Sequence, residues 1–329
     1  MGQESSFGNN ILSILAFLAI IVCNSSIYVV QGRIDPSRRI KCPIDSIYQL
    51  GDSISDTGNL KRLMPLNPAT RSPYGKTFPG HPTGRWSDGR LMIDYIAMSL
   101  GLPLLNPHMD RTASSKNGSN FAVAGSTALG PKFYASHGIY TRPIPSIQTQ
   151  LRLFKRHLAT FCVTPRECRR KLHNSLVFVG EIGYNDIAYP YGEGKPIDTI
   201  RRYDARGCVK NLNELIATRN AHLLRDIVQL RKEFPQANIQ YVDLYRDFDT
   251  LLHNGPQLGF NKTTLMKACC GGDPIFNPTG RLFCGNSKSA PLCPNPDNHI
   301  HWDGIHLTQE AYRHLAIAII RDLHIKCPR

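Results

Sequence analysis

Apolar stretches with helical spacing alternate along this chain with short β-prone runs, and this alternation restricts the fold more than any other feature. We expect helices over residues 88–100, 147–161, 208–234 and 309–323, and strands over residues 47–50, 121–124, 176–179 and 239–244. Strands that alternate with helices in this way usually pair in parallel, with the helices covering the sheet. The sequence, which contains no internal repeat, therefore predicts a single-domain α/β fold with a mostly parallel sheet.

A serine, an acid and a histidine occur in two short motifs at opposite ends of the chain. Residues 51–59 read GDSISDTGN and follow the first expected strand directly, so Ser53 lies just beyond its carboxyl end. In open α/β sheets this edge is where ligands bind. Residues 302–308 read WDGIHLT and supply Asp303 and His306. A serine hydroxyl attacks a carbonyl once a histidine takes its proton and a carboxylate orients that histidine. Ser53, His306 and Asp303 are therefore the candidate catalytic residues.

Two further segments bring hydrogen-bond donors to the same edge of the sheet. Asn185 follows the strand expected at 176–179, and Gly125 follows the run at 121–124. A developing oxyanion needs two or three preorganised donors. The side-chain amide of Asn185 and the backbone N–H of Gly125 are the candidates for this role.

These motifs resemble those of plant GDSL-type esterases/lipases, a branch of the SGNH hydrolases, and the resemblance covers nearly everything after Cys42. It extends to the runs CPIDSIY at 42–48, PTGR at 82–85, SDGR at 87–90 and ACCG at 268–271. The sequence of residues 42–101 is similar to that of the subgroup that contains acetylajmalan esterase and sinapine esterase. The resemblance implies a three-layer α/β/α, flavodoxin-like SGNH-hydrolase fold over residues 42–329, without a metal or cofactor.

The same resemblance implies the role of each site residue. Ser53 would be the nucleophile, His306 the general base and Asp303 its orienting acid. The amide of Ser53 would join Gly125 and Asn185 in the oxyanion hole. The implied reaction is hydrolysis of a carboxylic ester through an acyl-enzyme. An acyltransferase that uses the same acyl-enzyme is an alternative.

The chain departs from the family pattern after Asp186. Relatives continue there through a helix, a core strand and a Pro-x-Gly-Cys turn, whereas here only twenty residues separate Asp186 from Gly207-Cys208. One core strand, one helix and one cysteine are therefore missing, which would leave Cys208 without its usual partner. We expect either a gap in the sheet or slippage of the last strand, which would move His306 away from Ser53 unless the following loop absorbs the shift. A splice variant, a gene-model error and a genuine deletion would all produce this sequence. The deletion keeps open the alternative of an impaired or non-catalytic binding protein.

The amino terminus has the pattern of a signal peptide over residues 1–26. Its apolar run at 11–22 is too short to span a bilayer, and cleavage is expected near Ser25 or Ser26, with a later site near Gly32 as the alternative. An amino-terminal membrane anchor is the competing interpretation, and no other segment of the sequence could span a membrane. We therefore expect a secreted protein of the cell wall or, alternatively, of the vacuole, without stable membrane insertion after cleavage.

Cysteine content agrees with export. Of ten cysteines, Cys23 would leave with the signal, and the remaining nine predict disulfides with one residue left over. Cys162 and Cys168 are close enough in sequence to pair locally. The Gly- and Pro-rich stretch 254–298 contains four more, whose connectivity stays open: Cys269, Cys270, Cys284 and Cys293. A zinc site is the competing interpretation, against which stands the absence of the Cys-x2-Cys pairs typical of structural zinc.

The net charge of +14 does not come from a nucleic-acid-binding motif, because the basic residues are scattered and only 166–171 is a tight group. Such a surface fits anionic cell-wall polysaccharides or is simply a solvated face. Asn261 begins the sequon Asn261-Lys262-Thr263 in a polar loop and is a candidate glycosylation site. We expect the partner to be a small-molecule or cell-wall ester, and not nucleic acid.

Overall fold

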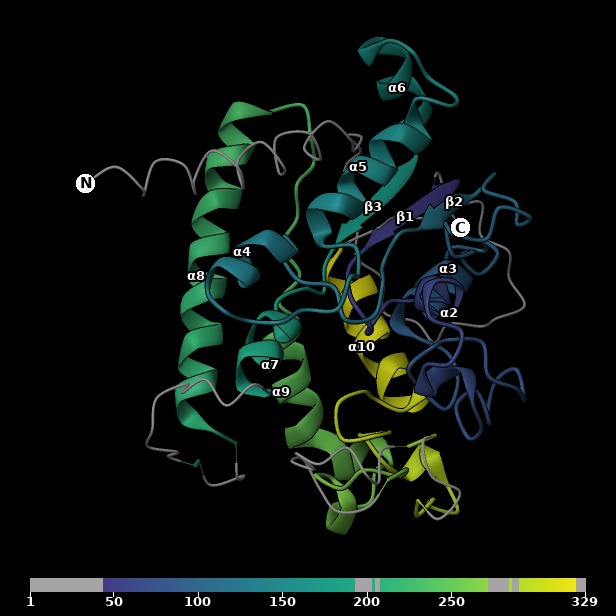
Figure 1. The fold of residues 1–329 in the computed structure, drawn as a ribbon, viewed down its shortest axis with the longest axis vertical. Coiled ribbons are helices and arrows are strands. Elements are labelled where there is room, and N and C mark those ends of the chain that lie inside the picture. Colours follow the sequence, from purple (N-terminus) through teal and green to yellow (C-terminus); the bar gives the residue numbers. More distant parts are fainter. Residues whose placement is uncertain (1–43, 193–202, 205–207, 272–283, 286–289, 324–329) are drawn as a thin grey trace.

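The computed structural model describes residues 44–192, 203–204, 208–271, 284–285 and 290–323. The expected signal peptide at 1–26, its cleavage sites, Cys23 and Cys42 lie outside this range. Within it, three strands form a parallel sheet in the order β2-β1-β3 (Figure 1). The strands are β1 (Ser46–Leu50), β2 (Gly118–Asn120) and β3 (Ser175–Val179).

The central strand β1 is buried on both faces, which explains its mostly apolar composition; its one amide side chain, Gln49, is hydrogen-bonded to backbone carbonyls. Ile47 packs on one face within the main core, and Tyr48 and Leu50 pack on the other. Because side chains of a strand alternate between faces, one short strand supports two helical layers. This arrangement confirms the predicted single-domain α/β fold.

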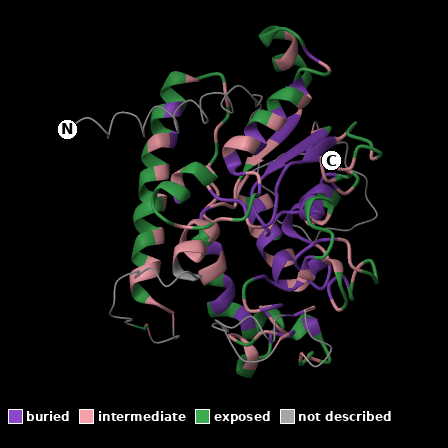
Figure 2. Ribbon diagram, in the orientation of Figure 1, coloured by how far each residue is buried: buried purple, intermediate pink, exposed green. Residues whose placement is uncertain are grey.

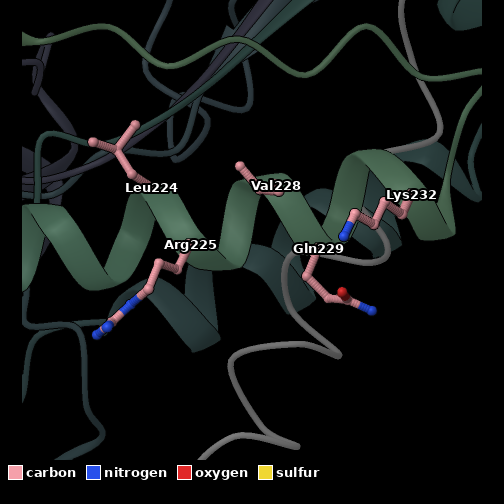
Figure 3. A pocket seen from close by; sticks show the side chains of 5 residues that line it. All are labelled: Leu224, Arg225, Val228, Gln229 and Lys232. Carbon is pink, nitrogen blue, oxygen red and sulfur yellow. The ribbon is translucent and has the colours of Figure 1, made fainter.

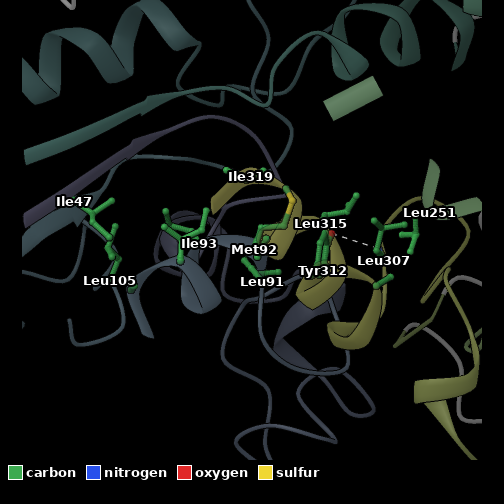
Figure 4. Packing of buried hydrophobic residues seen from close by; sticks show 14 of the residues in the cluster. Ile47, Leu91, Met92, Ile93, Leu105, Leu251, Leu307, Tyr312, Leu315 and Ile319 are labelled. Atoms are coloured by element: carbon green, nitrogen blue, oxygen red, sulfur yellow. Dashed lines mark hydrogen bonds between the residues drawn. The ribbon is translucent and has the colours of Figure 1, made fainter. Parts of the chain in front are cut away.

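Helices α3 (Met92–Ser99), α9 (Leu244–Asn254) and α10 (Gln309–Asp322) form the layer on the Ile47 side. Figure 4 shows Tyr312, Leu315 and Ile319 of α10 between side chains of α3 and of α9. The opposite layer is led by α5 (Ile147–Leu158), whose Leu151 and Phe154 contact the β1 face with Tyr48. The remaining helices are α2 (Asn59–Leu63), α4 (Pro131–Ser136), α6 (Pro165–Leu172), α7 (Tyr184–Gly192) and α8 (Lys210–Glu233). Short 3₁₀ turns complete the described structure: η1 (Pro68–Thr70), η2 (Gly255–Leu258), η3 (Lys262–Thr264) and η4 (Pro296–Asn298).

All four predicted helices are present, but two predicted strands need correction. The strand expected at 121–124 lies at Gly118–Asn120 instead. The N–H groups of Phe121 and Val123 still donate backbone hydrogen bonds to the carbonyls of Gln49 and Gly51, at 2.7 and 3.2 Å. The apolar run 121–124 is thus buried beside the end of β1 without forming a regular ladder.

The strand expected at 239–244 is absent, and this prediction was wrong. Residues 239–243 have no regular structure and lead into α9, which begins at Leu244. A further strand at 239–244 would need a neighbouring strand to pair with. In the described chain no strand lies between β3 and this run in the sequence, and β3 is at the edge of the sheet. The sheet therefore ends at β3, in agreement with the expected loss of a core strand.

Helix α8 is largely exposed. It is 24 residues long, yet only Ile227 and Leu230 are buried along it. Leu215, Leu224 and Val228 are 42–49% exposed, and Figure 2 shows α8 mostly in the colours of exposed and intermediate residues. A groove on this helix is lined by Leu224, Arg225, Val228, Gln229 and Lys232 (Figure 3). No helix among the described residues is long and apolar enough to cross a membrane.

Three disulfides cross-link the described chain. Cys162 pairs with Cys168, which confirms the predicted local pair. The cysteine-rich stretch contains two bridges whose connectivity the sequence left open, Cys269–Cys293 and Cys270–Cys284. Both bridges lie within this stretch, and the N–H groups of Cys269 and Cys270 donate to the carbonyls of His301 and Trp302 in the segment that precedes α10.

Candidate active site

The loop that carries Ser53 begins where β1 ends, and Gln150 of α5 defines that point. The carboxamide of Gln150 accepts from the N–H of Gly51 at 2.9 Å and donates to its carbonyl at 2.8 Å. Gln150 therefore fixes Gly51 at the end of β1, and the carbonyl of Gly51 also accepts the N–H of Val123. Ser53 follows in this turn and is 8% exposed.

Asp56 fixes the rest of the loop. Its buried carboxylate accepts backbone N–H groups from Gly58, Asn59 and Leu60 at 2.6–3.0 Å, and from Ala124 at 2.8 Å. Three of these donors begin α2, and the fourth belongs to the segment just before Gly125. One carboxylate therefore ties the Ser53 loop to the Gly125 loop.

Ser53, His306 and Asp303 form one hydrogen-bonded chain, although 253 positions separate the first two. Nε2 of His306 lies 2.8 Å from Oγ of Ser53, and Nδ1 lies 2.7 Å from Oδ2 of Asp303. With a proton on Nδ1 facing the carboxylate, Nε2 is free to accept the serine proton. The arrangement matches the geometry of a nucleophile, base and orienting acid.

The carboxyl of Asp303 is fully buried but ionised. Burial raises its pKa, but the nearby His306 and the hydrogen bonds from His306 and Tyr74 outweigh this effect, so that the net shift is downward. Its second oxygen, Oδ1, accepts the backbone N–H groups of Ile305 and His306 at 3.0 and 2.8 Å. The acid is therefore held in one orientation by four donors.

The loop of Asp303 and His306 is anchored without the missing strand. The N–H of Trp302 donates to the carbonyl of His306, and the N–H of Cys270 donates to the carbonyl of Trp302, both at 2.7 Å. Thr308 caps α10 by accepting the N–H of Ala311. The disulfide-bonded segment and α10 thus set the position of the histidine. The shift that slippage of the last strand would have caused is not seen at Ser53.

Gly125 and Asn185, the two predicted oxyanion donors, lie on adjoining segments. The side chain of Asn185 donates to the carbonyl of Ser126 at 2.9 Å, and the hydroxyl of Tyr189 donates to the carbonyl of Gly125 at 3.2 Å. Gly125 has φ of +86°, and a Cβ there would lie 2.7 Å from Cδ1 of Ile144. Only glycine fits this conformation and this space.

Two aromatic residues in contact with the triad were missed by the sequence analysis. The hydroxyl of Tyr74 donates to Oδ2 of Asp303 at 2.6 Å, and the ring of Trp86 lies over the imidazole of His306 with 4.8 Å between ring centres. Trp86 stands between the PTGR and SDGR runs, which was the one available signal. Tyr74 carried none, because its partner is 229 positions away.

A buried acid pair lies beside the nucleophile. Burial, and to a smaller extent the neighbouring carboxyl of Glu181, raise the pKa of Asp52 to about 8. Burial also raises the pKa of Glu181, whose carboxyl accepts the hydroxyl of Ser55 at 2.7 Å. A protonated Asp52 places no second negative charge next to Ser53, where an oxyanion would develop.

The predicted glycosylation residue Asn261 is exposed, and its side chain accepts the N–H of Thr263 at 2.9 Å. Cys269, Cys293 and His299 have ligand atoms within 4.8 Å of one another. The two sulfurs are joined in a disulfide, so this cluster offers no thiolate to a metal ion.

Comparison with known proteins decides the family. The family model described as GDSL-like Lipase/Acylhydrolase matches residues 47–205 and 187–319. The chain belongs to this family. Acetylajmalan esterase of Rauvolfia serpentina is 42% identical over 332 residues, covering 85% of each chain. Acetylajmalan esterase 1 of the same plant is 41% identical, covering 87% of this chain and 89% of its own. A GDSL esterase/lipase of Arabidopsis thaliana is 35% identical, covering 84% of this chain and 82% of its own. The protein is a GDSL-type carboxylic ester hydrolase.

The comparisons also support a shortened chain. The alignment with acetylajmalan esterase occupies 332 positions, more than the 329 residues of this GDSL hydrolase, yet it covers only 85% of them. Dozens of positions of the relative therefore face no residue here. The two segments of the family match meet at residues 187–205, directly after Asp186.

Proposed function

We propose that this GDSL hydrolase is a secreted enzyme that cleaves a carboxylic ester through Ser53, His306 and Asp303 and a covalent acyl-enzyme. The supporting observation is the hydrogen-bond chain from Oγ of Ser53 through the imidazole to the buried carboxylate. The oxyanion hole consists of the backbone N–H groups of Ser53 and Gly125 and the side-chain amide of Asn185.

In the first half-reaction, Nε2 of His306 takes the proton of Ser53 while Oγ forms a bond to the ester carbonyl carbon. The carbonyl π electrons move to the oxygen, whose negative charge the oxyanion donors stabilise. When the C–O bond to the alcohol breaks, the proton on Nε2 passes to the leaving oxygen, and an acyl-Ser53 ester remains. Asp303 stays ionised throughout and stabilises the imidazolium.

In the second half-reaction, water gives a proton to Nε2 while its oxygen forms a bond to the acyl carbon. The bond between this carbon and Oγ then breaks, the proton passes from Nε2 to Oγ, and the carboxylic acid leaves with Ser53 and His306 restored. An alcohol in place of water would give acyl transfer. Added alcohol that yields a new ester in preference to acid would identify the acyltransferase alternative.

The substrate class proposed is a small plant ester with a short acyl group. The support is the identity of 42% to a protein named acetylajmalan esterase. A series of p-nitrophenyl esters from acetyl to long acyl chains tests the acyl preference, and acetylated small molecules then test the alcohol.

Export is part of the proposal. The apolar run at 11–22, the three disulfides and the exposed sequon at Asn261 all fit an oxidising secretory route. Intact mass and peptide mapping of the protein recovered from medium would give the mature terminus and the glycan. Retention in cell extract with an intact amino terminus would refute export.

The catalytic proposal is tested with Ser53→Ala, His306→Ala and the exposed control Ser136→Ala. The first two should lose ester turnover and labelling by a fluorophosphonate, because activation of the serine needs both groups, whereas the control should keep both. Asn185→Ala should lower kcat by about 10²–10³ with little change in KM. Turnover that survives in Ser53→Ala would reject the nucleophile, and absence of labelling in the parent would favour the non-catalytic alternative.

A further inference from the structure

Tyr74 reaches the triad from a segment remote in sequence. Its side chain is 1% exposed, and its hydroxyl donates to the same oxygen of Asp303, Oδ2, that lies against Nδ1 of His306. Burial and the negative Asp303 raise the pKa of Tyr74 well above its ordinary value, so the phenol stays protonated and acts as a donor.

The ring of Tyr74 is fixed by its neighbours. It meets Trp86 and Trp302 edge-on, with ring centres 5.7 and 5.9 Å apart. Gly285 approaches from the disulfide-bonded segment so closely that a Cβ there would lie 3.1 Å from Cε2 of the tyrosine. Trp86 in turn lies over the imidazole. The hydroxyl is therefore held in place by a packed cluster and does not simply follow the carboxylate.

We infer that Tyr74 is a positioning residue of the proposed triad: by sharing Oδ2 of Asp303 with His306, it limits how strongly the carboxylate holds the protonated imidazole. A donor that withdraws charge from this oxygen weakens its attraction for an imidazolium. The base then stays unprotonated to lower pH than the Asp303–His306 pair alone would allow. This inference rests on the proposed function of the triad.

The other groups that face Asp303 act differently. Burial raises the pKa of Tyr184 and of Tyr312, and the negative charge of Asp303 also raises both values. The Tyr312 hydroxyl accepts the N–H of Leu307 at 3.3 Å. Burial lowers the pKa of His301 to about 4, so this histidine is neutral near neutral pH. Within the described residues, the side chains that donate to the carboxylate of Asp303 are those of His306 and Tyr74.

The test is Tyr74→Phe in the full chain, with Tyr48→Phe as the matched control. Both remove one hydroxyl from a buried tyrosine, but Tyr48 lies on β1 and its hydroxyl is influenced by Asp45 and Ser46. Two readouts are followed against pH in each protein. One is kcat/KM for p-nitrophenyl acetate, and the other is the downfield proton NMR signal of the Nδ1 proton between His306 and Asp303.

We expect the acid limb of kcat/KM in Tyr74→Phe to move up by about one pH unit, because a hydrogen bond to a charged group is of that strength. Turnover would fall about tenfold below the limb and change little above it. The downfield signal should shift its titration in the same direction and by a similar amount. Tyr48→Phe should leave both curves in place.

A loss of activity that is equal at every pH, or one that Tyr48→Phe reproduces, would reduce Tyr74 to a structural residue and overturn the inference. An unmoved downfield signal would overturn it too, even in a variant with altered turnover. If the parent has no Ser53-dependent turnover, the catalytic proposal fails, but the NMR titration still decides whether Tyr74 acts on the Asp303–His306 pair.

Discussion

Replacing Asp56 should damage both the stability and the catalytic rate of this hydrolase, because one carboxylate serves two loops. The change to make is Asp56→Ala, with Asp56→Asn as an intermediate step. Its oxygens accept four backbone N–H groups, three at the start of α2 and one from Ala124. Asp56 itself is fully buried.

The loss of stability follows from the number of buried N–H groups that the substitution leaves without an acceptor. Each buried N–H left without an acceptor costs about 1–3 kcal/mol, so Asp56→Ala should lower the free energy of unfolding by at least about 4 kcal/mol. A domain has only about 5–15 kcal/mol in total. Asp56→Asn keeps one acceptor oxygen and should lose roughly half as much. Because Ala124 precedes the proposed oxyanion donor Gly125, loss of its hydrogen bond to Asp56 should also displace that donor and lower kcat.

Urea denaturation followed by fluorescence measures the first effect, and turnover of p-nitrophenyl acetate by the folded fraction measures the second. Asp110→Ala is the control, since this carboxylate lies in a loop with its hydrogen bonds to Thr112 at the surface. A midpoint for Asp56→Ala equal to that of Asp110→Ala would refute the reasoning. It would mean that water replaces the carboxylate at no cost.

Three further outcomes are expected. On α8, Val228→Ser should change the free energy of unfolding by no more than about 0.5 kcal/mol, whereas Ile227→Ala at the neighbouring buried position should lower it by about 2–5 kcal/mol. Similar losses for the two variants would show that the outer face of the helix is covered. Joint replacement of Cys270 and Cys284 by alanine should cost about 3 kcal/mol, because the bridge spans 14 positions, and an unchanged urea midpoint would contradict this. The pKa of Asp303 is lowered in the folded protein, so its stabilising effect is present above the ordinary value of 3.8 and is lost as pH falls through the folded value. The difference in unfolding midpoint between the parent and Asp303→Asn should therefore narrow below pH 3.8, and a difference that widens there would contradict the assigned direction.

The helices and the first strand were predictable because each is defined by a local pattern. The spacing of apolar residues in 147–158 and 309–322 gives an amphipathic helix whatever the rest of the chain does. The run at 239–244 has the composition of a strand, but a strand also needs a partner. The deletion after Asp186 was readable in the sequence, but its effect on this distant run depends on which strands would have been neighbours.

The same distinction between local patterns and distant partners applies to the residues of the active site. Ser53, His306 and Asp303 stand in short motifs, so they were predicted before any geometry was known. Tyr74 and Gln150 act through hydrogen bonds to residues 229 and 99 positions away, and no local pattern marks such a pair. The pairing of Cys269 with Cys293 was likewise open, because sequence distance does not fix the path of a long loop.

The open side of β3 has a consequence for the protein in concentrated solution. Residues 176–179 read LVFV, an uncharged apolar run without proline that contains two β-branched residues and one aromatic residue, and Val179 is 39% exposed. In the described chain β3 pairs on one side with β1, so its other side presents N–H and C=O groups to any passing strand. Sequences of this kind aggregate when an edge exposes them. We therefore expect the missing neighbour of β3 to lower solubility at high concentration, while Nε2 of His306 stays 2.8 Å from Oγ of Ser53.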